Sequence, residues 1–448
     1  MPRTHPSNVI HLPGTTLEGG GQLLRLAICL SSLTSTPIRI SDIRGKRSGG
    51  GGLKAQHLTS VVWLARACGA RVSGVGLGSR EIVFGGKGGK EGFAGVGGDD
   101  WRYSGEVRIQ QSTPGSVNLV FQAILPYILF SSAHADTGAE AGAKELQEMD
   151  PIRVRITGGT NVSNSPSYDY IHQVLLPMLE KLGIPRIDAE LHSRGWSTGS
   201  TRLGTVTYTV RPLPPGAGLK AFELLHRGAI VKVQATILAP REYERMFQDL
   251  LQDWVERHGA KVFGEQEADF EVSFEDSHHA KRFYLLLVAT TSTGLKLGRD
   301  WLYDRAVRPG AKTENVVPAM VKKVFGDLVE EVKHGGCVDE FMRDQVVVFQ
   351  ALAEGRSRVF GGRKGRNGEE AGGVLLEPSL HAKTAQWVVE EILGVGFDEE
   401  GGCEGVGFGV DEGRVAREEK GKGEEVGKGK DEEDVDRLVE AAGGLKLE

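Results

Sequence analysis

The sequence predicts a mixed α/β (α+β) fold: a large domain of three β-α-β-α-type units that carries a smaller inserted α/β domain. Two observations predict it. An apolar segment of helical length that leads into a short strand-like segment occurs three times, and an amphipathic helix follows each time. Roughly a hundred residues between the second and third units do not follow this plan, which is typical of an insertion.

The first helix of each unit begins at small or polar residues and runs into a strand, in residues 21–44, 115–159 and 339–360. The second helices fall in residues 52–72, 167–184 and 380–397. Each of these amphipathic segments meets a glycine just past its end, as helix C-termini commonly do. The glycines are Gly69, Gly183 and Gly394.

The insertion contains strand-like segments at residues 229–238 and 282–294 and two helical segments. The sequence therefore predicts four parts. Residues 1–219 hold the first two units of the large domain, residues 220–336 form the inserted domain, residues 337–397 complete the third unit, and residues 398–448 form an acidic tail.

Charge is unevenly distributed along the chain. The net charge is −6, but residues 398–448 hold 17 acidic and 8 basic residues, a net of −9, which leaves +3 for residues 1–397. The tail is rich in Gly, Glu and Lys and poor in apolar residues, so we expect most of it to be disordered. The slightly basic remainder is suited to a polyanionic ligand.

No membrane or export signal is expected. No apolar run approaches the ~20 residues that span a bilayer, and the N-terminus lacks the layout of a signal peptide. The four cysteines of the chain are scattered without a CxxC spacing, so disulfides and a structural zinc site are not expected. We expect a location in the nucleus (nucleoplasm), with the cytoplasm as the second location.

Polar residues gather at the starts of the repeated helices. Equivalent helix ends in a repeated fold tend to meet, and helix N-termini favour phosphate. A basic loop beside them supplies arginine forks that match phosphate oxygens. Each signal alone also fits a solvated loop or a capping histidine. The residues concerned are Glu18, Gln22, Arg25, Arg44, Lys46, Arg47, Lys54, Gln56, His57, Ser116, Gln122, Tyr168, Asp169, Arg343, Asp344, Gln345, His381 and Lys383.

The run Gly19–Gly20–Gly21 stands directly before the first apolar helix. Glycine here either ends a strand or removes side chains so that a ligand reaches the backbone. It matches neither the Walker loop nor the dinucleotide pattern. Beside the other helix starts, we interpret it as one wall of a phosphate site.

Taken together, six ordered segments resemble the RNA 3'-terminal phosphate cyclases. They are "EGGGQLLR", "IRGKRS…GLKAQHLT", "STPGSVNLVFQAILP", "GGTNVSNSPSYDYI…LLPMLEKLGI", "DEFMRDQ" and "EPSLHAKT". The resemblance implies a large domain akin to the enolpyruvyl transferases. It also implies a ligase-type enzyme that uses ATP to convert an RNA 3'-phosphate end into a 2',3'-cyclic phosphate, through a histidine–AMP intermediate and an RNA adenylate.

The resemblance also assigns roles to residues. The nucleophile falls on His381, and Glu18 matches a carboxylate that holds a divalent metal, Mg or Mn, on the phosphates. The contacts to ATP fall on Gln122, Phe341, Met342, Arg343, Asp344, Gln345, Gln22 and Arg25. The resemblance implies that Arg44, Arg47 and His57 bind the substrate and its terminal phosphate.

Two alternatives belong to other functional classes. A catalytically inactive cyclase-like factor in pre-rRNA processing or ribosome assembly has the same fold but lacks the histidine and the intact glycine motif, both of which are present here. An RNA-binding module without catalysis needs exposed aromatics on a basic face. The sequence does not indicate the oligomeric state.

Overall fold

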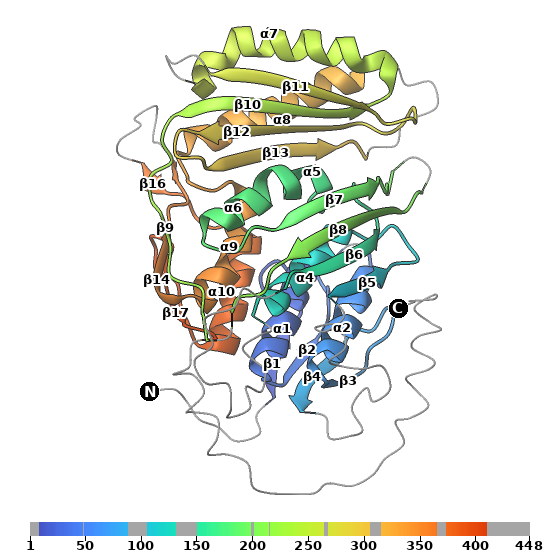
Figure 1. Ribbon diagram of the computed structural model, residues 1–448, viewed down its shortest axis with the longest axis vertical. Helices are drawn as coiled ribbons and strands as arrows, with labels where there is room; N and C mark the ends of the chain where they lie inside the picture. The colour runs from blue at the N-terminus through green and yellow to red at the C-terminus, as the bar shows by residue number, and fades with distance from the viewer. Residues whose placement is uncertain are drawn as a thin grey trace, which may run out of the picture.

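The computed structural model describes residues 9–47, 49–87, 105–130, 150–198, 201–214, 216–263, 268–304, 315–364 and 373–409. Strands and helices alternate through these ranges, which confirms the predicted mixed α/β class. A large domain occupies the lower two thirds of Figure 1, and a sheet with two helices caps it at the top. The predicted acidic tail lies outside the described residues from position 410 onward.

The first sheet has the strand order β1-β2-β4-β3. β1 (Ile10–Pro13) runs parallel to β2 (Ile38–Ser41), and α1 (Gly21–Thr34) supplies the crossover that a parallel pair needs. α2 (Ala55–Cys68) then leads to the antiparallel strands β3 (Ala70–Ser73) and β4 (Ile82–Lys87).

The second sheet repeats this order as β5-β6-β8-β7. Its parallel pair is again joined by a buried helix, and its last two strands are again antiparallel. The elements are β5 (Glu106–Gln110), α4 (Val117–Leu129), β6 (Ile152–Gly158), the consecutive α5 (Tyr168–Tyr170), η2 (Ile171–Leu175) and α6 (Leu176–Lys181), β7 (Asp188–Ser193) and β8 (Gly204–Val210).

The third sheet has the order β17-β14-β9, with β9 parallel and β17 antiparallel to β14. These pairings match those of β1, β2 and β4. A short hairpin of β15 and β16 lies between its two helices. The elements are β9 (Glu223–Leu224), α9 (Glu340–Leu352), β14 (Glu354–Val359), β15 (Arg363–Lys364), β16 (Val374–Leu375), α10 (Leu380–Leu393) and β17 (Gly402–Val406).

The insert holds a four-stranded sheet, β11-β10-β12-β13, and two long helices. Its strands are β10 (Ile230–Ala239), β11 (Asp269–Asp276), β12 (Tyr284–Thr291) and β13 (Lys296–Leu302). A short η3 (Arg241–Tyr243) leads into α7 (Glu244–Phe263), and α8 (Val316–Lys333) follows the sheet.

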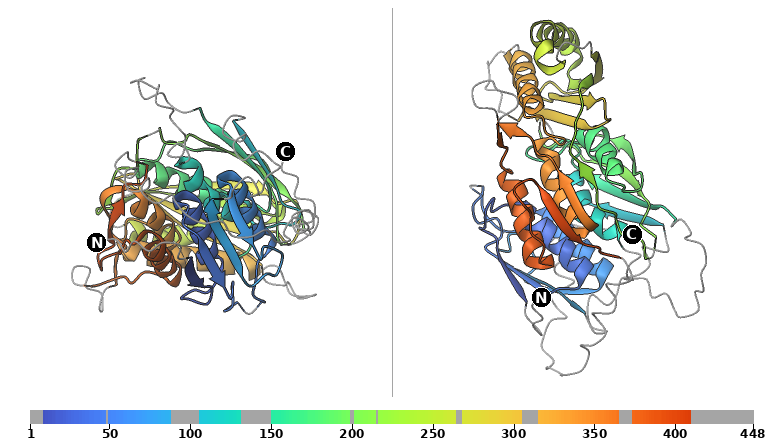
Figure 2. Two further views of the ribbon diagram at one scale, coloured as in Figure 1. Left: turned by 90° about the horizontal axis from the view of Figure 1, so that it is seen from below. Right: turned by 90° about the vertical axis from the view of Figure 1, so that its left-hand side faces the viewer.

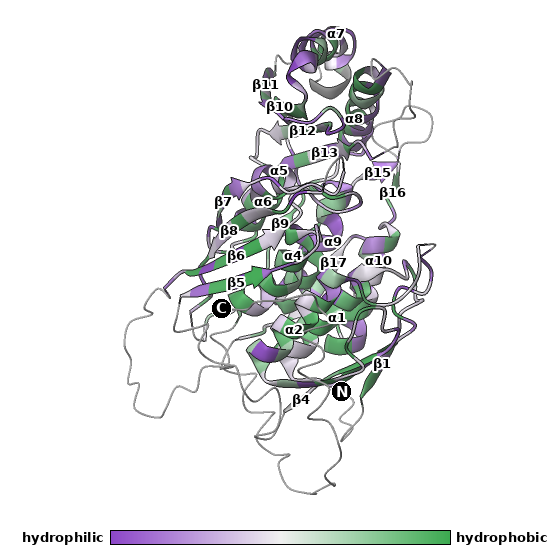
Figure 3. Ribbon diagram, turned by 90° about the vertical axis from the view of Figure 1, so that its right-hand side faces the viewer, coloured by the Kyte–Doolittle hydropathy of each residue, from purple (hydrophilic) through white to green (hydrophobic). Residues whose placement is uncertain are grey.

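Strand β12 explains how the insert is attached. Along it, Leu285 and Leu287 belong to the core beneath α7 and α8, while Tyr284 and Leu286 belong to the core of the large domain. Because successive side chains point to opposite faces, a strand covered on both sides is apolar throughout. Helices show the same effect of burial in Figure 3. The buried α4 is hydrophobic around its surface, whereas α7 carries hydrophilic residues on its outer side.

Two predicted boundaries differ from the structure. Residues 223–224, which the sequence assigned to the insert, form β9 and pair with β14 of the large domain. Residues 402–406, which the sequence assigned to the tail, form β17, and Cys403 is buried there. The Gly- and Glu-rich composition hid this strand because its backbone pairing with β14, rather than apolar side chains, holds it. None of the helices within the described ranges is long and apolar enough to cross a membrane.

One buried carboxylate joins three parts of the fold. Asp339, the N-cap of α9, is fully buried, and its Oδ1 accepts hydrogen bonds from the Tyr170 hydroxyl at 2.7 Å and from the Met342 backbone N–H at 2.8 Å. Its Oδ2 accepts from the Gly298 backbone N–H of β13 at 2.7 Å. One side chain therefore connects the second unit, the insert and the start of α9.

We predict that Tyr170→Phe destabilises the protein. The change removes a donor from a buried carboxylate, which typically costs about 1–3 kcal/mol in free energy of unfolding. Chemical denaturation at fixed pH measures the difference. A loss under about 0.5 kcal/mol, the range of ordinary surface substitutions, would show that Tyr170 does not support Asp339.

Candidate active site

The starts of several helices from distant parts of the chain meet in the large domain. α1 packs against α2, α4 and α10, and α10 packs against α9. The right-hand view of Figure 2 shows α10, near the C-terminal end of the described chain, beside α1 from its beginning. Because helix N-termini carry free N–H groups and positive dipole ends, this region favours anions.

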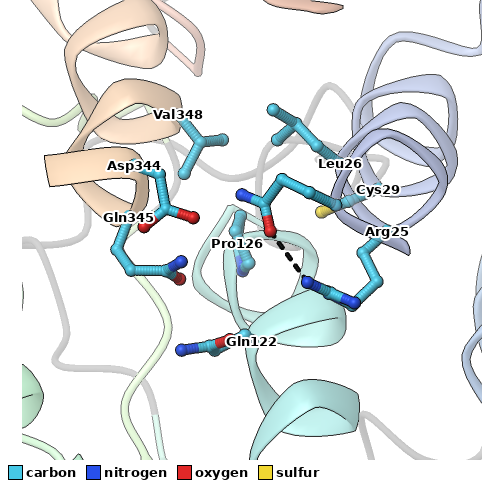
Figure 4. A pocket seen from close by; sticks show the side chains of 9 residues that line it. Arg25, Leu26, Cys29, Gln122, Pro126, Asp344, Gln345 and Val348 are labelled. Atoms are coloured by element: carbon cyan, nitrogen blue, oxygen red, sulfur yellow. Dashed lines mark hydrogen bonds between the residues drawn. The ribbon is translucent and has the colours of Figure 1, made fainter. Parts of the chain in front are cut away.

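A cleft of about 370 Å³, counted out to its mouth, lies between α1, α4 and α9. Five predicted ligand contacts line it, and the Arg25 guanidinium donates a hydrogen bond to Gln22 Oε1 at 2.8 Å. Figure 4 shows these side chains converging from the three helices. The lining consists of Gln22, Arg25, Leu26, Cys29, Gln122, Pro126, Asp344, Gln345 and Val348.

Burial perturbs both charged groups of this cleft. It raises the pKa of Asp344 to about 7, although a hydrogen bond with Gln345 and the charge of Arg25 oppose the rise. Burial also lowers the pKa of Arg25 to about 10, against the opposing charges of Asp344 and Glu18. Asp344 thus changes its charge near neutral pH while Arg25 stays cationic.

The glycine run at the start of α1 makes room for the chain's own side chains. A Cβ at Gly21 would lie 2.6 Å from His57 Nε2 and 2.8 Å from Arg25 Nη1, and one at Gly20 would overlap the carboxylate of Glu18. The glycines therefore let three polar groups converge beside the helix start. Our interpretation of the run as one wall of a phosphate site stays a prediction.

Glu18 lies between the basic loop and α10. Its carboxylate forms an ion pair with Arg47, and its backbone N–H donates to Thr384 Oγ1 at 3.1 Å. The Glu18 side chain is only 7% exposed, and its Oε2 has no hydrogen-bond partner among the described residues. A buried carboxylate oxygen without a partner is a suitable ligand for a divalent cation.

A metal here would need further ligands. The described ranges contain no group of three or more His, Cys, Asp or Glu residues placed to hold an ion. Phosphate oxygens supply the missing ligands in sites where Mg²⁺ is bound by one or two carboxylates. The residues therefore fit a metal that arrives with a phosphate-bearing ligand.

His57 is a neutral donor in this cluster. Its Nδ1 accepts a hydrogen bond from the Lys54 backbone N–H at 3.2 Å, so its proton resides on Nε2. Burial lowers the pKa of His57 to about 3, and the charges of Arg25 and Arg44 contribute. Nε2–H points to the space beside Gly21 and is suited to donate to an anion.

His381 lies in the first turn of α10, just after the N-cap Ser379, and is exposed. Partial burial lowers the pKa of His381 below its ordinary value. The nearby carboxylate of Glu18 opposes this shift, whereas Arg25 and Arg47 add to it. The imidazole is therefore mainly neutral at pH 7 and has a free lone pair for nucleophilic attack.

Besides Glu18, Arg47, His57 and His381, four more predicted site residues lie outside the lining of the cleft. Arg44 is buried, and its Nη1 donates to the Gly52 carbonyl at 3.2 Å, so it holds the glycine loop. Met342 is in the hydrophobic core. Phe341 packs edge-on against Tyr170, under the guanidinium of Arg299 at 4.9 Å. The fourth, Arg343, donates to a backbone carbonyl at the segment before α10.

Two residues near the nucleophile were missed. Thr384 follows His381 by three positions, which places both at the same end of one helix face, and this spacing was a usable signal. Glu340 contributes its charge to His381 from the start of α9, and no signal in the sequence connects the two positions.

The chain is similar to proteins of one family. The family model described as RNA 3'-terminal phosphate cyclase matches residues 16–398. Three relatives bear the name RNA 3'-terminal phosphate cyclase. The one from Pyrococcus furiosus is 30% identical over 88% of this chain and 96% of its own length. The relative from Korarchaeum cryptofilum is 31% identical over 88% of this chain and 94% of its own length. The relative from Ignicoccus hospitalis is 30% identical over 86% of this chain and 93% of its own length.

These relatives are archaeal, so they give no support to the predicted nuclear location. The family model spans the chain from the residues before the glycine run to the end of α10. With a match over most of the chain and relatives aligned along nearly their whole length, the chain belongs to the RNA 3'-terminal phosphate cyclase family.

Proposed function

We propose that this protein uses ATP to convert an RNA 3'-terminal phosphate into a 2',3'-cyclic phosphate through an adenylylated histidine. The observation that carries the proposal is the position of His381. Its imidazole is exposed and favours the neutral form, the charges of Glu18, Arg25 and Arg47 act on it, and its helix is joined to Glu18 through Thr384. The names of the relatives support the reaction.

In the first step, a ring nitrogen of His381 attacks the α-phosphorus of ATP. A P–N bond forms, the bond from the α-phosphorus to the bridging oxygen breaks, and pyrophosphate leaves. The other ring nitrogen then releases its proton to solvent. The positive charges of Arg25 and Arg47, which act on His381, would stabilise the charge that develops on the phosphate oxygens.

The cleft beside the nucleophile is suited to the nucleoside. The carboxyl group of Asp344 would accept hydrogen bonds from ribose hydroxyls, and the amides of Gln122 and Gln345 would bind polar edges of the nucleotide. Arg25 belongs both to this cleft and to the surroundings of His381. It would therefore bind the phosphates between the two.

The unpaired Oε2 of Glu18 would hold a divalent metal, Mg or Mn, together with the phosphates of ATP. The ion neutralises phosphate charge when bound. Glu18 is itself fixed by Arg47 and by the hydroxyl of Thr384, which limits the reorganisation needed on binding.

The later steps transfer AMP to the RNA. An oxygen of the 3'-phosphate attacks the phosphorus on His381, the P–N bond breaks, and the imidazole regains a proton from solvent. The neighbouring ribose O2' then attacks the activated 3'-phosphate and gives its proton to solvent. The new O–P bond closes the ring, the bond that joins the 3'-phosphate to AMP breaks, and AMP leaves. The donor Nε2–H of His57 and the half-exposed Arg47 would bind the RNA terminal phosphate.

The relatives carry the name of an enzyme, so they do not favour the alternative of an inactive factor in ribosome assembly. We propose the binding of ATP, of the metal and of the RNA end on the same grounds. A nuclear location remains a prediction from the sequence alone.

We predict covalent labelling of the protein by ATP labelled at the α-phosphate, in the presence of a divalent metal. Label should resist alkali and be lost in acid, as expected of a P–N bond. ATP labelled at the γ-phosphate should leave no label, because pyrophosphate departs. His381→Ala should reduce the signal to background.

His278→Ala is the matched control, because this histidine is exposed on the insert. It should label like the parent protein. Undiminished labelling of His381→Ala, or an unlabelled parent protein, would refute the adenylylated-histidine route.

We further predict that Glu18→Gln weakens the use of metal. The amide keeps the shape of the side chain but removes the charge that attracts the ion. The metal concentration for half-maximal labelling should rise by roughly tenfold or more, the loss expected when a metal site is perturbed. A metal titration superimposable on that of the parent would remove Glu18 from this role.

A further inference from the structure

Arg343 has a defined binding partner outside the cleft. It occupies the position next to Asp344 on α9, yet its side chain turns away from the cleft lining. Its Nη1 donates a hydrogen bond to the backbone carbonyl of Glu377 at 3.1 Å. A hydrogen bond from a charged donor is stronger than one between neutral groups.

The guanidinium of Arg343 lies flat against Gly361. A Cβ built on Gly361 would be 2.5 Å from Arg343 Cζ, 2.6 Å from Nη2 and 2.8 Å from Nε. Gly361 has no left-handed φ, so its backbone does not require glycine. The missing side chain instead provides the space that Arg343 fills.

The carbonyl that Arg343 binds belongs to the segment directly before the nucleophile. Glu377 precedes His381 by four positions, and Ser379 between them caps α10 by accepting from the Ala382 backbone N–H at 3.2 Å. The side chain of Glu377 also pairs with Lys383 at 2.6 Å. This segment is thus held from α10 on one side and from α9 on the other.

The same segment is joined to the exit of the insert. The Leu376 backbone N–H donates to the Gly362 carbonyl at 2.9 Å, and the Arg363 backbone N–H donates to the His334 carbonyl at 2.7 Å. His334 is the C-cap of α8, the last helix of the insert. These backbone hydrogen bonds hold the upstream part of the segment, and Arg343 binds it from α9 at Glu377.

We propose that Arg343 is a positioning residue: by binding the Glu377 carbonyl it sets the position of His381 relative to the cleft lined by Asp344. Its catalytic consequence rests on the function proposed above. Because Arg343 and Asp344 are adjacent on one helix, a single turn of α9 fixes both the nucleoside cleft and the nucleophile. A small displacement of a reacting group is enough to slow a group transfer strongly.

The first test measures the segment itself. Hydrogen exchange of the backbone amides in residues 374–382 should become about tenfold faster in Arg343→Met, which removes a charge-assisted hydrogen bond. Arg343→Lys, which keeps one donor, should show a smaller increase. Arg186→Met is the matched control, because Arg186 is an exposed arginine paired with Asp188. It should leave these amides unchanged.

Gly361→Ala supplies an independent variant. The added methyl group should displace Arg343 without removing its charge, and it should reproduce the faster exchange. In the Arg343→Met background the same change should add nothing, because the two residues act through one contact. Additive effects in the double variant, or unchanged exchange in Arg343→Met, would overturn the proposal.

The catalytic readout separates this role from a role in binding ATP. In Arg343→Met the single-turnover rate of labelling by α-labelled ATP should fall about tenfold or more, while the dissociation constant for ATP stays within twofold. A raised dissociation constant with unchanged exchange would make Arg343 an ATP ligand instead. If the parent protein is not labelled at all, the proposed function fails, and the exchange measurements still decide the contact.

Discussion

Close approach at the start of α1 is the constraint on which the site depends. At Gly20 and Gly21 no side chain can be present, since Glu18, His57 and Arg25 occupy that space. Three consequences follow. His57 presents a neutral donor, Arg25 lines the cleft while its charge acts on His381, and Glu18 keeps one carboxylate oxygen without a partner among the described residues. The glycine run therefore brings together groups from the segment before α1, from α1 itself and from α2 at one helix N-terminus, where a phosphate is favoured.

The sequence was sufficient for the class of fold because helix length and apolar periodicity are local properties. It was insufficient where a contact spans the chain. Asp339 reads as an ordinary N-cap, yet its carboxylate joins Tyr170, 169 positions earlier, to the insert through Gly298. Strand β17 was missed for a related reason. Only Cys403 among its residues signals burial, and the pairing of its backbone with β14 is not encoded in its composition.

The same limit applies to the site. Gln22 and Arg25 lie three positions apart on one face of α1, and that spacing places both in the cleft. In the run from Phe341 to Gln345, only Asp344 and Gln345 line it, because α9 turns the other three side chains elsewhere. The sequence contains this helical phase but not the identity of the helices packed around it. For Arg343, binding to the Glu377 carbonyl becomes evident only in three dimensions.

The central claim is that the surroundings of His381 keep its imidazole neutral and ready to attack a phosphorus atom. NMR titration of the histidine ring protons, with the His381 signal assigned by its absence in His381→Ala, tests this directly. The account predicts a pKa for His381 below the ordinary value of about 6.5, because burial and the charges of Arg25 and Arg47 outweigh the opposing charge of Glu18. A pKa above about 7 would make the imidazolium, which cannot act as the nucleophile, the main form at neutral pH and would contradict the account.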